Sequence, residues 1–233
     1  ILFRLVGSEM CIRDSSTTAN GVVTAANLTS AILTSANLNG RDLTSVDLEK
    51  ADLSGANLTS AKLENATLIG AKLITDGSST VKLNSANLTN AKMEKADLTG
   101  ANLTSADLVG ADLTGADLTG TILTSTVFSE TADGVVATAT LTSAILTGAN
   151  LKDRDLTGVD FEKANLSGAN LTGADLENAT LIGAKLIADG NTAVKLMGAT
   201  LTGAKLEKAD LTGADLGKYG DVKTNLVGAD LTG

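Results

Sequence analysis

The chain has 233 residues, a net charge of −9 and a pI of about 4.5, and only 2% of its residues are aromatic. It contains no His and no Trp, Cys11 is its only cysteine and Tyr219 its only tyrosine, so the usual components of hydrolytic, metal-binding and base-stacking sites are missing. We therefore expect no enzyme activity, no cofactor and no bound metal. The negative charge disfavours direct contact with nucleic acid, and no apolar run is long enough to span a membrane.

The N-terminal segment, residues 1–20, carries no repeat. Within it, Ile1 to Ser15 is too short and too interrupted for a secretory signal. Two interpretations stand: this stretch is foreign to the natural protein, or it caps the first repeat. We expect Ile1 to Ser15 to pack poorly and to be dispensable.

From Ala26 to Gly233 the chain repeats a five-residue pattern of Ala, Asp or Asn, Leu, Thr or Ser, and a small residue. Residues 51–55, 56–60 and 111–115 are three copies. One large apolar residue at every fifth position fits neither the helical nor the strand period, so the chain must turn a corner about once per repeat. The Leu and Ala side chains would then fill a narrow interior without voids.

This pattern resembles the pentapeptide-repeat family, whose consensus is A(D/N)LXX. The resemblance implies an all-β fold, a right-handed quadrilateral parallel β-helix in which one pentapeptide makes each side and four make a coil. In such a solenoid the Leu and the Ala two residues before it point inward. The resemblance also implies a rigid, non-catalytic protein, and some family members are implicated in protecting or inhibiting DNA gyrase by imitating DNA.

A second, longer repeat shows that the chain is a tandem duplication. Gly21-Val22-Val23 reappears as Gly134-Val135-Val136, and Arg41-Asp42-Leu43 as Arg154-Asp155-Leu156, each 113 residues later. We divide the chain into a first array at residues 21–128, a connecting loop at 129–140 that contains Asp133-Gly134, and a second array at 141–233.

Each array has one interruption at an equivalent place, at Asp76-Gly77 and at Asp189-Gly190. Either a polar residue, Ser78 or Asn191, points inward there, or the chain loops out. We favour a loop because Asp-Gly is a strong turn signal and a buried Asn needs hydrogen-bond partners. A third interruption, at residues 217–221, has no counterpart in the first array.

If no slip occurs, residues twenty apart stack, and one side of the coil then lacks Lys, Arg and Glu in the first array. We predict that this side is flat and is the candidate interaction face. Its residues are Asn57, Thr59, Asp97, Thr99, Asp117 and Thr119.

Three function classes follow. The first is a rigid structural or protein-interaction module with an unknown protein partner, for which a homodimer is an open alternative. The second is a DNA mimic acting on DNA gyrase, which the net charge favours and the outward lysines disfavour. The third is a Thr-lined face that orders water or ice. The cytoplasm is the default expectation for the compartment.

Overall fold

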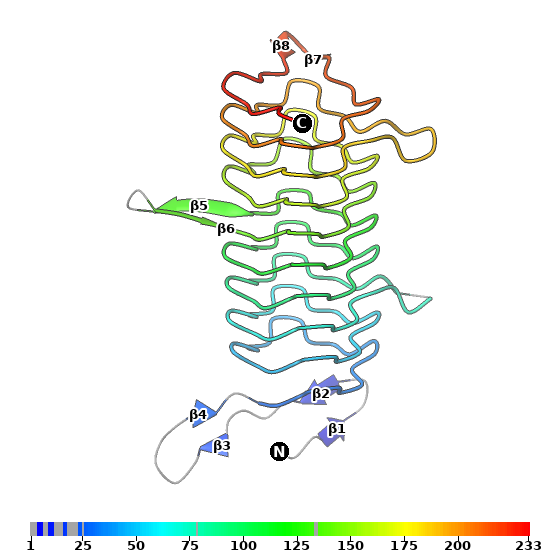
Figure 1. Ribbon diagram of the computed structural model, residues 1–233. Coiled ribbons are helices and arrows are strands. Elements are labelled where there is room, and N and C mark those ends of the chain that lie inside the picture. The colour runs from blue at the N-terminus through cyan, green and yellow to red at the C-terminus, as the bar shows by residue number, and fades with distance from the viewer. Residues whose placement is uncertain are drawn as a thin grey trace.

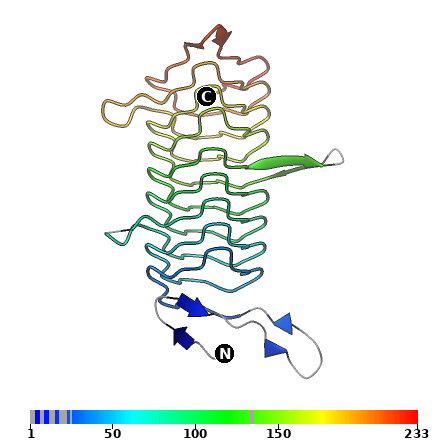
Figure 2. The same cartoon turned by 180° about the vertical axis from the view of Figure 1, so that it is seen from behind.

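The computed structural model describes residues 4–6, 9–11, 16–17, 23–24, 26–77, 79–132 and 135–233. From residue 26 onwards the chain winds into a stack of coils that forms an elongated rod (Figures 1 and 2). The described residues include no helix. The all-β parallel β-helix expected from the repeat is therefore confirmed.

The coils are joined by parallel backbone pairing at the second residue of each repeat. Asn27 pairs with Asp47, and Asp47 with Thr67, twenty residues or four repeats further on. Each pair is flanked by two hydrogen bonds, as where the Leu28 amide donates to the Asp47 carbonyl over 2.6 Å and the Asp47 amide to the Ala26 carbonyl over 3.0 Å. Four repeats per coil give the rod four faces.

We name each face by the second-position residues that stack along it. The first face carries Asn27, Asp47, Thr67, Lys92, Asp112, Thr140, Asp160, Thr180, Lys205 and Asp230; the second carries Ile32, Asp52, Lys72, Asp97, Asp117, Ile145, Asn165, Lys185 and Asp210; the third carries Asn37, Asn57, Lys82, Asn102, Ile122, Asn150, Asn170, Lys195 and Asp215; and the fourth carries Asp42, Lys62, Asn87, Asp107 and Val127, then Asp155, Asp175, Thr200 and Asn225.

The interior is built from the third-position Leu and the first-position Ala of each repeat, which are buried through most of the rod. Phe128, Phe161 and Met93 replace Leu and are also fully buried. Thr121 and Thr126 replace Ala, and their hydroxyls donate to the carbonyls of Leu118 and Leu103 over 2.9 and 2.8 Å. These bonds satisfy the polar groups inside an otherwise apolar core.

The corner of each repeat explains its polar residues. The amide of Ala56 donates to the Leu53 carbonyl over 2.9 Å, closing a turn in which Gly55 has φ +67°. A positive φ there favours Gly and Asn, which accounts for the small fifth residue. The Asp52 carboxylate accepts the Ser54 amide over 3.1 Å, and this side-chain bond accounts for Asp or Asn at the second position.

The two Asp-Gly interruptions are loops, as expected. Asn57 pairs with Lys82, and Asn170 with Lys195, twenty-five residues later instead of twenty, so one pentapeptide leaves the coil at each site. Asp76 and Ser79 close the first loop through backbone and side-chain bonds of 3.1 and 2.7 Å. Ser78, the alternative inward residue, lies outside the described residues.

The segment expected as a connecting loop contains a β-hairpin. Strands β5 (Ser129–Ala132) and β6 (Val135–Thr138) pair antiparallel and project sideways from the rod (Figures 1 and 2). Thr and Val residues favour such pairing, and Asp133 and Gly134 lie outside the described residues. Because Asp112 pairs with Thr140 across this level, the two arrays form one continuous stack.

The remaining strands are short. At the third interruption β7 (Lys218–Tyr219) pairs antiparallel with β8 (Val222–Lys223). Near the N-terminus β1 (Arg4–Val6) pairs with β2 (Glu9–Cys11), and β3 (Ser16–Thr17) with β4 (Val23–Thr24), again antiparallel. Most of residues 1–25 lie outside the described residues, so the weak packing expected of Ile1 to Ser15 stays a prediction.

Removing a core Leu should destabilise the rod according to its depth. Leu113 is fully buried, whereas Leu216 occupies the same repeat position near the C-terminal end and is 42% exposed. We expect Leu113→Ala to lower the free energy of unfolding by about 2–5 kcal/mol and Leu216→Ala by less than about 1 kcal/mol. Urea unfolding followed by circular dichroism measures both, and equal losses would contradict a core filled along its whole length.

The loop at Asp189 should depend on one glycine beneath it. A Cβ at Gly168 would lie 2.9 Å from the Asp189 Cβ, whereas a Cβ at Gly148, one coil away on the second face, meets nothing within 4 Å. Both residues have similar positive φ angles of +65° and +67°. We expect Gly168→Ala to cost about 1–3 kcal/mol more than Gly148→Ala in thermal or urea unfolding. A smaller cost at Gly168 than at Gly148 would show that the loop does not rest on the coil.

Candidate interaction surface

The six residues predicted to share one face lie on two faces. Asn57 and Thr59 belong to the third face, because Asn57 pairs with Asn37 and Lys82. Asp97, Thr99, Asp117 and Thr119 belong to the second face, because Asp97 pairs with Lys72 and Asp117. The predicted single column is wrong because the pentapeptide that leaves the coil at residue 76 shifts every later repeat by one face. Both faces also contain lysine.

The polar side chains of these residues hold their own corners. The Asn57 side-chain oxygen accepts the Thr59 amide over 3.1 Å, and the Asp117 carboxylate accepts the Thr119 amide over 2.9 Å. Asp97 accepts both the amide and the hydroxyl of Thr99, over 3.1 and 2.7 Å. These bonds fix the direction of each side chain relative to the backbone.

Four of the six residues stay together beside two exposed isoleucines. Ile145 follows Asp117 on the second face and is 38% exposed, and Ile122 lies in the next repeat after Asp117, on the third face, and is 45% exposed. We call this set the junction patch. It consists of Asp97, Thr99, Asp117, Thr119, Ile122 and Ile145.

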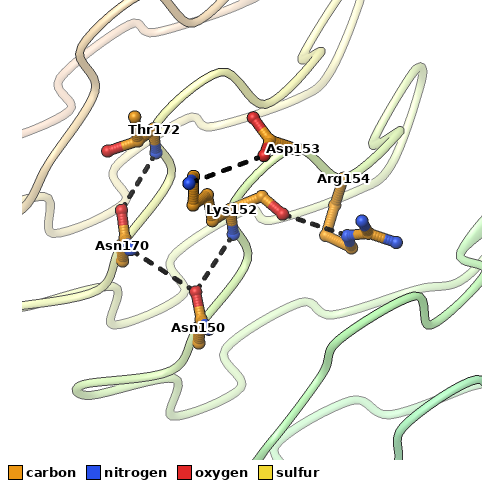
Figure 3. Close-up of polar contacts among 6 residues, drawn as sticks. All are labelled: Asn150, Lys152, Asp153, Arg154, Asn170 and Thr172. Carbon is orange, nitrogen blue, oxygen red and sulfur yellow. Dashed lines mark hydrogen bonds and ion pairs between the residues drawn. The ribbon is translucent and has the colours of Figure 1, made fainter. Parts of the chain in front are cut away.

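A charged cluster on the third face of the second array was not among the predicted site residues. Figure 3 shows Lys152 with its ammonium 3.8 Å from the Asp153 carboxylate, and Arg154 donating to the Lys152 carbonyl over 3.1 Å. Asn150 accepts the Lys152 amide over 3.3 Å and the Asn170 side-chain amide over 3.4 Å. The signal in the sequence was the loss of the small consensus residues at Lys152 and Asp153.

The hairpin formed by β7 and β8 packs on this cluster. The Lys152 ammonium lies 4.9 Å from the centre of the Tyr219 ring. A Cβ at Gly198 would lie 2.8 Å from the Tyr219 Cβ, so bare backbone is needed where the hairpin crosses the third face. Hydrogen bonding to Tyr219 is the largest cause that raises the pKa of Lys152, and the negative charge of Asp153 raises it further. The amine therefore stays protonated near neutral pH, which suits ion pairing rather than nucleophilic or general-base chemistry.

Neither a metal-binding cluster nor a membrane-spanning helix is present among the described residues. Nowhere in the described ranges do three His, Cys, Asp or Glu side chains gather closely enough to hold a metal ion. The described part of the chain also has no helix suited by length and apolarity to cross a membrane.

The sequence matches the family model for pentapeptide repeats in eight copies, over residues 24–59, 42–73, 82–120, 138–173, 155–187 and 195–217. Among solved structures it is similar to trypsin-treated QnrB1, a plasmid-mediated fluoroquinolone resistance protein, with 18% identity and a TM-score of 0.66 over 89% of this chain and 92% of that one. It is also similar to HetL, a pentapeptide repeat protein involved in heterocyst differentiation regulation from the cyanobacterium Nostoc sp. strain PCC 7120. There the identity is 30% and the TM-score 0.42, over 88% of this chain and 87% of that one. A search of curated proteins gave no match.

The carboxylates at the corners should make the free energy of unfolding depend on pH in the acid range. Hydrogen bonds from the Ser54 hydroxyl and then the Ser54 amide hold the pKa of Asp52 below its ordinary 3.8, and Thr212 does the same for the pKa of Asp210. Because the unfolded chain binds these protons at higher pH, the free energy of unfolding should fall as the pH drops below about 3.8 through the folded pKa.

Replacing these carboxylates with amides tests the assignment. Asp52→Asn with Asp210→Asn keeps an acceptor at each corner, so we expect near-native stability at neutral pH and a smaller loss in the acid range. Urea unfolding at a series of pH values compares the two proteins. If the free energy of unfolding falls equally with pH in the variant and in the unsubstituted protein, these two carboxylates do not contribute to the loss of stability in acid.

Proposed function

The chain belongs to the pentapeptide-repeat family, and we propose that it is a non-catalytic, rigid module that binds a protein partner on the junction patch. The observation that carries this proposal is the unbroken ladder between the arrays on the second face, where Asp97 pairs with Asp117 and Asp117 with Ile145. The patch residues are thus held on backbone that is hydrogen-bonded on both sides.

The chemistry of the patch supports docking of a protein. Thr and Asp side chains are short and already bonded to their corners, so they lose little conformational entropy on binding. The side chains of Ile122 and Ile145 are both exposed and supply the apolar surface of the patch. The patch carries carboxylates and no lysine, which favours a partner surface that offers amide donors or basic side chains.

The charge distribution argues against a DNA mimic acting on gyrase. Lys62, Lys72, Lys82 and Lys92 are all exposed, one on each face. A duplex carries one negative charge per ~1.7 Å, so a rod of ten coils, about 48 Å long, would need about 28 negative charges. The chain has a net charge of −9.

The same register shift removes the support for a protein that orders water or ice on a Thr-lined face. Its basis was a single Thr column, and Thr59 lies on a different face from Thr99 and Thr119. A regular Thr lattice is therefore not formed by these residues.

Lysine substitutions on two faces test the junction patch. We expect Thr99→Lys with Ile145→Lys to lose at least about tenfold in partner affinity, because two long charged side chains would enter a complementary surface. Thr59→Lys, the matched control on the third face, should bind normally. Bound proteins are identified by quantitative cross-linking and mass spectrometry, with circular dichroism as the folding control. Equal capture by both variants would exclude the junction patch as the interface.

A gyrase supercoiling assay distinguishes the proposed protein-binding module from a DNA mimic that acts on gyrase. We expect the purified protein to leave supercoiling unchanged, with or without a fluoroquinolone. Inhibition or protection at stoichiometric protein would favour the DNA mimic instead.

A further inference from the structure

A seam in the backbone ladder runs between two neighbouring coils where the two arrays meet. Within the described rod, six backbone amides at this level donate to no backbone carbonyl, although the repeat places a carbonyl of the neighbouring coil opposite each of them. Buried amides normally find a partner, so the gap needs a physical cause. The six amides belong to Leu123, Ser125, Phe128, Asn150, Asp155 and Asp160.

The equivalent amides are bonded in the coils on either side. The counterparts of Phe128 on the fourth face are Leu108, one coil below, and Leu156, one coil above. The Leu108 amide donates to the Val127 carbonyl over 2.8 Å, and the Leu156 amide to the Asp175 carbonyl over 2.7 Å. The seam is therefore a local break and not a general property of this face.

The ladder is intact where the chain approaches the seam and again where it leaves it. On the second face the Leu118 amide donates to the Ile145 carbonyl over 2.7 Å. On the first face, directly after the hairpin, the Leu141 amide donates to the Asp160 carbonyl over 2.7 Å. The break is thus confined to one part of one turn of the rod.

The pairing weakens from the second face to the fourth, which lies opposite to it. On the third face Ile122 still lies beside Asn150 as a parallel pair, but without the two amide-to-carbonyl bonds that flank other pairs. On the fourth face, within the described rod, Val127 has no paired residue in the coil above. A graded loss of this kind corresponds to a wedge that is closed on the second face.

Bulky interior residues crowd the coil below the seam. Thr121 and Thr126 stand where most repeats have Ala, Phe128 stands where they have Leu, and all three are buried. A single large residue is tolerated elsewhere, because the Phe161 amide still donates to the Thr180 carbonyl over 2.7 Å. Three in one coil, at the point where the chain leaves for the β5–β6 hairpin (Figure 1), overfill the interior and push the coils apart.

Two polar side chains at the seam bond to their own side of it. The Thr126 hydroxyl donates to the Leu103 carbonyl of the first array over 2.8 Å. The Arg154 Nε donates over 3.1 Å to the Lys152 carbonyl, which the repeat would otherwise place opposite the Ser125 amide. Neither bond crosses the seam, so neither resists a separation of the two coils.

We propose that the seam is a hinge between the two arrays. The second face, where the ladder is intact, is the spine of this hinge, and the fourth face opens and closes as the angle between the arrays changes. Sharp bends in regular structure occur where ladder hydrogen bonds are lost, and a hinge needs only a few residues that absorb the motion. Coils bonded on all four faces resist bending, so the motion is concentrated at this level.

The hinge changes the shape of the junction patch. Asp117 and Ile145 stand on the spine on either side of the seam, whereas Ile122 lies on the third face at the edge of the seam. Bending therefore moves Ile122 relative to Ile145, and a partner that covers both holds the rod at one angle. This consequence rests on the proposed function, whereas the hinge itself is tested without any partner.

Distances between spin labels across the seam test the hinge. In a Cys11→Ser background, one pair of labelled cysteines replaces Lys62 and Asp175 on the fourth face, and the matched pair replaces Lys72 and Lys185 on the second. Each pair spans five coils, about 24 Å. We expect the distribution of distances on the fourth face, measured by double electron–electron resonance, to be at least about twice as broad as that on the second. Equal widths would overturn the proposal.

Hydrogen exchange measured by nuclear magnetic resonance reports on the same opening. We expect the amides of Leu123 and Ser125 to exchange at least about a hundredfold faster than those of Leu103 and Ser105, their bonded counterparts one coil below. Equal protection at the two levels would show that the coils do not separate, and the hinge would then be wrong.

Restoring the consensus interior should close the seam. Thr121→Ala with Thr126→Ala and Phe128→Leu removes the crowding, so we expect the distance distribution on the fourth face to narrow to the width on the second. Phe161→Leu, the matched control in a bonded coil, should change neither width, and circular dichroism checks the folding of both variants. A broad distribution that the triple variant leaves unchanged would place the bending elsewhere and overturn the proposal.

Discussion

The backbone hydrogen bond from one coil to the next is the constraint on which the molecule depends. The Leu58 amide donates to the Lys82 carbonyl over 2.7 Å although a loop lies between these residues, and the Leu113 amide donates to the Thr140 carbonyl over 2.8 Å across a hairpin. The ladder requires only that the chain return to the stack at its point of departure. Excursions of different lengths are therefore tolerated, and the faces keep their alignment.

The sequence predicted the interior and the corners because both are local. A buried Leu at every fifth position and one corner per repeat are requirements within a single repeat, and both were predicted. The side-chain oxygen that accepts the corner amide and the positive φ of the fifth residue were found only in the structure. The loops at Asp76 and Asp189 were predicted for the same reason.

The composition of the faces could not be predicted in the same way, because it depends on counting repeats through the loops. Leu73 and Leu83 keep the five-residue phase whether or not one pentapeptide leaves the coil, so a wrong column looks as regular as a right one. The contact between Lys152 and Tyr219 is even harder to predict from the sequence. It joins residues separated along the chain by three coils, a loop and part of a hairpin, and no local signal marks it.

The unit that was duplicated has a geometric meaning beyond its length of 113 residues. It closes on five whole coils, because Asp47 and Asp160 stand on the same face with Thr67, Lys92, Asp112 and Thr140 between them. Copying such a unit lengthens the rod in steps of about 24 Å without rotating one half against the other. Loop and hairpin residues add nothing to that step. Rods of this kind can thus grow or shrink by recombination in fixed increments, each keeping its spacing of surface features.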